Sequence, residues 1–252
     1  MLEGSASGSG PLVLLIHGTA PAIWGDLPAL LSESHRVITY DRRSFGSSPG
    51  AAPRELTTHA ADAVTLLRRC GGPATLVGWS IGAVIAIEVA AEHPELVDGM
   101  VLLEPPLHAK RHPRAAMVSA IAGATLLGKL GRPEAGARRF LRWALGRRDG
   151  STDLDTMPAE WHARLAAGDG AAVVRELAAG TGEHLDAQRL SRINAPTRVL
   201  RGDNSQTVFA DAARRAADAI PGAALIDVAG SGHAIQLDAP RLVVDSIAAT
   251  RS

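Results

Sequence analysis

Short apolar runs that alternate with helical patterns are the feature of this sequence that most limits its fold. Helical patterns lie at residues 57–69, 81–92, 211–220 and 240–249. Six runs are short enough for single strands and apolar enough to be covered on both faces: residues 12–16, 36–40, 74–77, 100–103, 197–200 and 224–228. Because strands buried on both faces belong to parallel sheets with helices on each side, the sequence predicts an α/β fold with a doubly wound, mostly parallel sheet.

One long segment interrupts this alternation. Residues 107–190 contain no convincing strand and instead contain four helical stretches, at residues 115–130, 133–145, 158–167 and 171–179. We interpret this segment as a helical lid inserted into an α/β core of residues 11–106 and 191–252. Residues 1–10 are rich in glycine and serine, and we predict a flexible N-terminus or a remnant of cloning there.

Composition and charge exclude several classes of protein. Basic and acidic side chains number 26 each, so the chain has no net positive charge that would attract nucleic acid or an anionic membrane. The single cysteine, Cys70, excludes an internal disulfide, and no run of about 18 apolar residues could span a bilayer. Because the first residues also lack the pattern of a secretory signal, we expect a cytoplasmic protein.

A serine lies at the junction of a predicted strand and a predicted helix. The segment Gly78-Trp79-Ser80-Ile81-Gly82 follows the run ATLV and opens the helical run IGAVIAIEVAAE. A turn this sharp forces its central residue into a strained conformation with an exposed side chain, and the glycines avoid a clash between strand and helix. The helix N-terminus also favours negative charge that develops on a substrate. The pattern therefore indicates Ser80 as a nucleophile.

With this motif the sequence resembles the α/β-hydrolase superfamily, in which G-x-S-x-G forms the nucleophile elbow. The resemblance extends over nearly the whole chain outside residues 1–10 and the lid. His17-Gly18-Thr19 resembles the His-Gly turn after the family's third strand. The resemblance implies that the backbone N–H groups of Thr19 and Ile81 form the oxyanion hole that acyl transfer needs. We interpret His17 itself as a structural histidine bonded to the local backbone.

The candidate general base lies near the C-terminus. Gly230-Ser231-Gly232-His233 follows the last predicted strand and resembles the family's G-x-G-H loop, whose histidine reaches the nucleophile. A serine hydroxyl is a weak nucleophile until a neighbour accepts its proton. An imidazole that titrates near neutral pH can take that proton and return it to the leaving group. We therefore predict that His233 is the base.

The acidic residue departs from the commonest pattern of the family. Most members carry the acid three positions beyond a glycine, after the strand that precedes the histidine strand. Here Gly202 is followed at that spacing by Ser205, and Asp203 lies two residues early. A second location known in the superfamily is the loop after the strand that follows the nucleophile helix, where this chain has Glu104. A carboxylate from either strand could orient the imidazole, and we favour Glu104 over Asp203, which could cap its loop instead.

One further loop, two histidines and several bulky side chains also have patterns that indicate a role. Residues 41–48 resemble the family's D-x-R-G-x-G-x-S loop, for which we predict a structural role. His108 and His112 have the spacing of two metal ligands on a helix, but no further ligand cluster accompanies them, so we predict no metal. Bulky side chains that could line an acyl pocket or simply pack are Trp24, Trp79, Met117, Phe140, Trp143, Met157 and Trp161.

The predicted function is hydrolysis of an ester or thioester by Ser80, His233 and the acid, through an acyl-enzyme and without a cofactor. We expect an esterase, lactonase or thioesterase that acts on a small-molecule metabolite, with polyketide chain release as one form. The acyl substrate could be free or bound to a carrier protein, and the enzyme a monomer or homodimer without nucleic-acid or membrane partners. Two alternatives stay open: a cofactor-free dioxygenase or lyase on the same fold, and a non-catalytic small-molecule binder.

Overall fold

Seven strands form one sheet in the computed structural model, which describes residue 2 and residues 4–48, 50–51, 53 and 55–250. In spatial order they are β1 (Gly4–Ser7), β3 (Arg36–Tyr40), β2 (Leu12–Ile16), β4 (Ala74–Trp79), β5 (Val97–Leu103), β6 (Thr197–Gly202) and β7 (Ala224–Val228). β1 runs antiparallel to β3, and the other neighbouring pairs are parallel. The predicted α/β fold with a mostly parallel sheet is confirmed.

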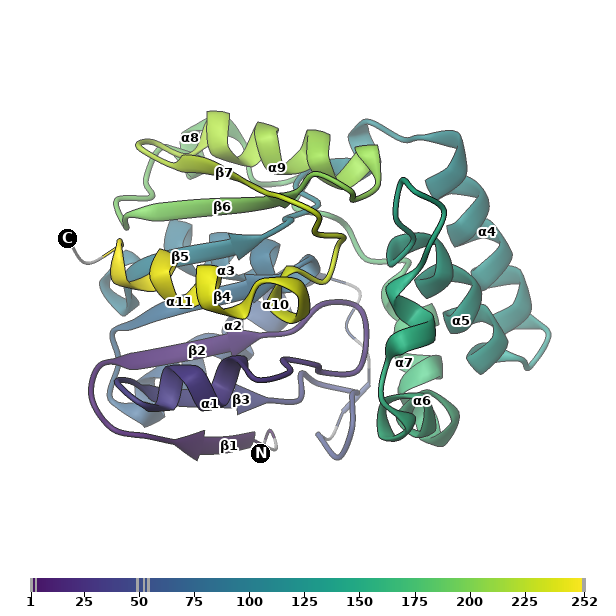
Figure 1. Ribbon diagram of the computed structural model, residues 1–252, viewed down its shortest axis with the longest axis horizontal. Helices are drawn as coiled ribbons and strands as arrows, with labels where there is room; N and C mark the ends of the chain where they lie inside the picture. The colour runs from purple at the N-terminus through teal and green to yellow at the C-terminus, as the bar shows by residue number, and fades with distance from the viewer. Residues whose placement is uncertain (1, 3, 49, 52, 54, 251–252) are drawn as a thin grey trace.

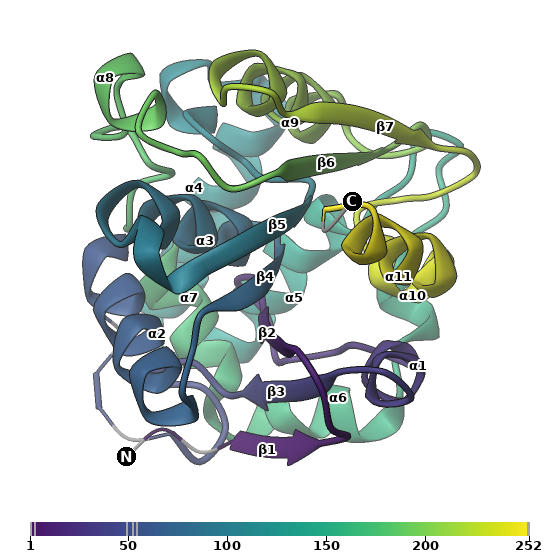
Figure 2. The ribbon, with the colours of Figure 1, turned by 90° about the vertical axis from the view of Figure 1, so that its left-hand side faces the viewer.

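Helices cover both faces of the sheet (Figure 2). On one face α2 (Leu56–Cys70), α3 (Ile81–Glu92) and α9 (Thr207–Ala219) share an apolar cluster with Leu14 of β2. On the other face α1 (Leu27–Ser32) and α11 (Pro240–Ala248) share a second cluster with Leu15. Successive residues of a strand point to opposite faces, so β2 has to be apolar throughout. The short helices α8 (Ala187–Leu190) and α10 (Ile235–Asp238) complete the core.

The boundaries of most elements agree with the sequence. β2, β3, β7 and α3 match their predicted ranges residue for residue. β4 runs two residues further than the prediction of 74–77, because Gly78 still pairs with Ile16 on one side and Leu102 on the other. The long β4 leads directly into the turn at Ser80.

The prediction of a flexible start is wrong for Gly4–Ser7, which pairs with Val37–Tyr40 as strand β1. All four residues of β1 are exposed, so no apolar pattern marks this strand in the sequence. Its stability comes from backbone pairing at the edge of the sheet, which small polar residues do not prevent.

The inserted segment forms a group of helices beyond one end of the sheet (Figure 1). It follows β5 and therefore lies at the edge where the parallel strands have their carboxyl ends, the edge where α/β sheets bind ligands. Within the described part of the chain, no helix is long and apolar enough to cross a membrane. The main helices of this insertion are α4 (Ala115–Lys129), α5 (Pro133–Ala144), α6 (Ala159–Arg164) and α7 (Gly170–Glu176).

Candidate active site

Ser80 occupies a strained turn between β4 and α3. Its φ of 54° and ψ of −124° lie in a region that non-glycine residues rarely adopt. A Cβ on Gly78 would lie 2.4 Å from Cα of Ala83, and one on Gly82 would lie 2.0 Å from the carbonyl oxygen of Ile16. The two glycines are therefore required by the close approach of strand and helix, as the sequence predicts.

His233 and Glu104 form a buried pair. Nδ1 of His233 lies 2.7 Å from Oε2 of Glu104, and the two side chains are 3% and 0% exposed. Glu104 accepts two more hydrogen bonds, from the backbone N–H of Gly202 to Oε1 (2.9 Å) and from the hydroxyl of Ser205 to Oε2 (2.6 Å). Both oxygens of the buried carboxylate are thus hydrogen-bonded, and the contact with Nδ1 fixes the imidazole ring.

Asp203 is bonded elsewhere. Its Oδ1 accepts the backbone N–H of Gly230 at 2.8 Å, which links the loops after β6 and β7. In this structure Nδ1 of His233 is bonded to Glu104, and the contact of Asp203 agrees with the predicted capping of its loop. Ser205, at the position where the acid is commonest in the family, instead supports Glu104 from the next strand.

The turn after β2 packs directly against Ser80. A Cβ on Gly18 would lie 3.0 Å from Cβ of Ser80, so a side chain there would push the two turns apart. Thr19 and Ile81 line the same pocket as Ser80 and His233. Ile81 begins α3, where backbone N–H groups have no partner within the helix. The two residues predicted to donate to the oxyanion therefore line the same pocket as Ser80.

The pocket extends from Ser80 into the insertion and is mostly apolar. The predicted wall residues Trp79, Met117, Phe140 and Trp143 line it. Ile121, Leu141, Ala144, Leu145, Leu177 and Phe209 add further apolar surface. Such a cavity suits an apolar group next to the reacting atom.

Three other predicted wall residues do not line this pocket in the described part of the chain. Trp24, Met157 and Trp161 are buried in the apolar cluster that also holds α1 and α11. Trp161 donates its indole N–H to the carbonyl oxygen of Pro21 at 3.0 Å. The prediction of Trp24 as a pocket residue is wrong, because its ring packs in the core, and a sequence does not distinguish these two environments.

Two aromatic residues hold His233, and the sequence indicated only one of them. Phe209 stacks on the imidazole with 3.8 Å between ring centroids and 14° between planes. The indole N–H of Trp79 donates to the carbonyl oxygen of His233 at 2.9 Å. The sequence does not indicate Phe209, because its helical pattern places the start of this helix at residue 211, whereas α9 begins at Thr207.

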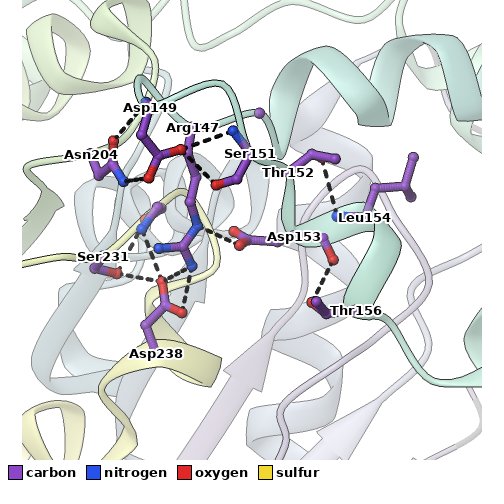
Figure 3. Close-up of polar contacts among 12 residues, drawn as sticks. Arg147, Asp149, Ser151, Thr152, Asp153, Leu154, Thr156, Asn204, Ser231 and Asp238 are labelled. Carbon is purple, nitrogen blue, oxygen red and sulfur yellow. Dashed lines mark hydrogen bonds and ion pairs between the residues drawn. The ribbon is translucent and has the colours of Figure 1, made fainter.

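Arg147 of the insertion braces the loop that carries His233 (Figure 3). Its Nε donates to Asp153 and its Nη2 to Asp238, each at 2.6 Å. Asp238 also accepts the backbone N–H of Gly232 at 2.9 Å. The segment between α5 and α6 therefore fixes the glycine-rich turn just before the histidine.

A buried ion pair joins the core to α7. Nη1 of Arg42 lies 2.5 Å from Oε1 of Glu176, Nη2 lies 2.9 Å from Oε2, and the side chains are 0% and 2% exposed. Nε2 of His59 lies 3.0 Å from the same Oε1. Burial alone would raise the pKa of Glu176, but the charge of Arg42 and the hydrogen bonds outweigh burial and hold it well below its usual range. The sequence predicts a structural role for the loop of Arg42 and carries no signal for Glu176.

His108, one of the two histidines with the spacing of metal ligands, is instead bonded to the backbone. Nε2 of His108 is bonded to the carbonyl oxygen of Leu185 at 2.9 Å. Among the residues that the structure describes, no group of three or more His, Cys, Asp or Glu side chains could hold a metal ion.

A serine in a strained strand-to-helix turn, beside a histidine paired with a carboxylate, is typical of hydrolases built on an α/β sheet. The chain belongs to the alpha/beta hydrolase family, whose model matches residues 13–246.

Known proteins of several activities are similar to the chain. It is 31% identical over 257 residues to the polyketide synthase ThaQ of Burkholderia thailandensis, a match that covers 91% of this chain and 11% of the synthase. It is 38% identical over 99 residues to the pimeloyl-[acyl-carrier protein] methyl ester esterase of Methylococcus capsulatus, which is 38% of each protein. The matches thus span only part of these two relatives. The solved structure of the putative non-heme bromoperoxidase BpoC from Mycobacterium tuberculosis H37Rv is 25% identical, has a TM-score of 0.78 and covers 100% of this chain and 97% of that one.

Proposed function

We propose that this protein is a serine hydrolase that cleaves an ester or thioester of a small molecule. Ser80 is the nucleophile, His233 the general base and Glu104 the acid of the triad. The backbone N–H groups of Thr19 and Ile81 bind the oxyanion. The observation that carries this proposal is the 2.7 Å contact between His233 and the fully buried Glu104, with His233 and Ser80 on one pocket.

The proposed reaction is acyl transfer through an acyl-enzyme. Oγ of Ser80 attacks the carbonyl carbon while its proton passes to Nε2 of His233, because Nδ1 is held by Glu104. The carbonyl oxygen becomes an oxyanion that the two N–H groups stabilise. When the intermediate collapses, His233 returns the proton to the leaving group, an alcohol or thiol. Water then attacks the acyl-enzyme through the same base and releases the acid.

The apolar pocket supports a substrate with an apolar acyl group. The relatives named as a polyketide synthase and as an esterase of an acyl-carrier-protein substrate support a thioester or ester of such a chain, free or carried by a protein. The walls from α4 and α5 make the insertion a candidate lid whose side chains select the acyl group.

The test is covalent labelling by a fluorophosphonate, read as intact mass, together with turnover of p-nitrophenyl esters. We expect one label on the wild type and none on Ser80→Ala. Glu104→Gln should reduce labelling rate and kcat by about 10²–10⁴-fold, because the imidazole loses its orienting charge. The matched variant Asp203→Asn should stay close to the wild type in both.

Unlabelled wild-type protein without ester turnover would refute the proposal. Turnover that survives in Ser80→Ala would instead support a cofactor-free reaction in which the histidine acts on the substrate directly. A stronger effect of Asp203→Asn than of Glu104→Gln would reverse the assignment of the acid.

A further inference from the structure

The carbonyl oxygen of Gly18 accepts hydrogen bonds from two buried side chains. Nη2 of Arg42 lies 2.7 Å from this oxygen and Nδ1 of His17 lies 2.9 Å from it. The residues that donate are 1% and 0% exposed. Two donors that are costly to bury therefore converge on one peptide unit, next to Ser80.

A second contact determines which nitrogen of His17 carries the proton. The backbone N–H of Arg42 can only donate, so Nε2 of His17, 2.9 Å away, accepts and Nδ1 is protonated. Burial, followed by the charge of Arg42, holds the pKa of His17 well below its usual range. The ring is therefore neutral and donates from Nδ1 to Gly18.

The Gly18 carbonyl and the Thr19 N–H belong to the same peptide unit. A peptide unit is planar, and in the trans form its C=O and N–H point in opposite directions. When the oxygen is fixed on the buried side, the N–H of Thr19 is directed the other way, and Thr19 lines the pocket beside Ser80. Hydrogen bonds to the oxygen also polarise the peptide and strengthen its N–H as a donor.

Glu176 fixes Arg42 in the orientation that this contact requires. The two carboxylate oxygens bind two nitrogens of the guanidinium, and Nη2 uses its other hydrogen for Gly18. A buried ion pair is rarely more stabilising than apolar packing of the same volume, so stability alone gives a weak reason for this arrangement. Glu176 belongs to α7, so the insertion determines the position of Arg42.

We propose that His17, Arg42 and Glu176 are positioning residues that aim and polarise the Thr19 N–H as an oxyanion donor. The inference rests on the proposed function, since it assigns these residues a part in that reaction. The insertion then has a second role besides lining the pocket, because Glu176 of α7, through Arg42, holds the turn at Gly18 and Thr19 in the orientation that oxyanion binding requires.

Arg42→Lys tests the proposal, because lysine keeps the charge but lacks the planar fork that binds Glu176 and Gly18 together. The measurements are kcat and KM for a p-nitrophenyl ester and Ki for an alkyl trifluoromethyl ketone, which forms a tetrahedral adduct with the serine. We expect kcat to fall on the order of 10- to 100-fold, since loss of an oxyanion donor costs about 10²–10³-fold. The ketone Ki should rise by a similar factor, while KM stays within about twofold.

Arg164→Lys is the matched control. Arg164 also joins the insertion to the loop after β3, with Nη2 2.7 Å from Asp41 and Nε 2.9 Å from Asp169, but it has no bond to Gly18. We expect kcat and the ketone Ki to remain at their wild-type values in this variant. Glu176→Gln is the second test: it keeps the shape, weakens the hold on Arg42 and should lower kcat several-fold with the same rise in Ki.

The outcomes separate this inference from the proposed function. If Ser80→Ala abolishes labelling but Arg42→Lys and Glu176→Gln keep the wild-type kcat and Ki, the triad stands and the positioning role is wrong. Equal losses in Arg42→Lys and Arg164→Lys, or a rise in KM without a change in Ki, would also overturn it. Should Arg42→Lys fail to fold, Glu176→Gln decides by the same comparison of Ki with KM.

Discussion

Ser205 has a hydroxyl at the position where an acid is common in the resembled family. Because it contacts Glu104, we infer that an acid at position 205, after β6, can replace the acid at position 104, after β5. Oγ of Ser205 lies 2.6 Å from the same Oε2 that binds His233. We predict that Glu104→Ala lowers kcat about 10²–10⁴-fold and that adding Ser205→Asp restores at least tenfold of it, because an aspartate there can reach Nδ1. Steady-state turnover of an ester by the single and double variants measures this.

The control for that exchange is Glu104→Ala with Ser205→Asn, which has the same shape without the charge and should restore nothing. Equal activity of the two double variants would show that residue 205 cannot take over the role of the acid.

At the residue scale, the sequence predicted those site residues that have a local signature. Ser80 and His233 lie in short motifs, and Glu104 directly follows a strand in a recognisable position. Phe209 and Glu176 could not be predicted this way, since their contacts with His233 and Arg42 join residues far apart in sequence without a pattern around either one. Trp24 shows the same limit, because a bulky side chain has no signal for facing a cavity.

At the scale of elements, the contact between the insertion and the histidine loop depends on Arg147. Its side chain is 16% exposed and binds Asp153, Asp238 and the carbonyl oxygen of Gly230. We predict that Arg147→Ala lowers the free energy of unfolding by about 1–3 kcal/mol, because the buried Asp153 and the partly exposed Asp238 lose an ion-pair partner, and lowers kcat as the turn before His233 loosens. Urea unfolding and ester turnover measure the two effects.

Arg142→Ala supplies the comparison within the same insertion. Its ion pair with Asp155 is 60% and 62% exposed, so its loss should cost less than about 0.5 kcal/mol and leave kcat unchanged. Equal destabilisation by the two variants would mean that the contact with the histidine loop contributes no more to the free energy of unfolding than the exposed ion pair.

Elements with a clear apolar pattern were predictable, and those stabilised only by their surroundings were not. β2 and α3 are buried along their length, so their ranges follow from the sequence alone. β1 has four exposed residues and pairs through its backbone, and α1 has only six residues, too few for a clear period. Neither element contributes a residue to the pocket around Ser80, so the candidate site could be predicted without them.

At the scale of the whole molecule, two buried histidines make stability depend on pH. Burial, and next the charge of Arg42, lowers the pKa of both His17 and His59 below 6.5 in the folded protein. In the unfolded chain both would titrate near 6.5. Below that pH the unfolded chain binds protons that the folded protein does not, so the free energy of unfolding falls as pH falls. The stabilisation is present above pH 6.5 and is lost below it, by about 1.4 kcal/mol per pH unit for each histidine.

Replacement of one of these histidines should reduce this dependence. Urea unfolding at pH 7.5, 6.5 and 5.5 gives the slope, and His59→Gln should decrease it below pH 6.5 by up to about 1.4 kcal/mol per unit, because one proton uptake on unfolding is removed. His112→Gln, a replacement at an exposed position, is the comparison variant. A slope that is the same in His59→Gln and the wild type would mean that His59 is protonated in the folded protein. The cluster around Glu176 would then carry a second positive charge beside Arg42, and Glu176 would form ion pairs with both Arg42 and His59.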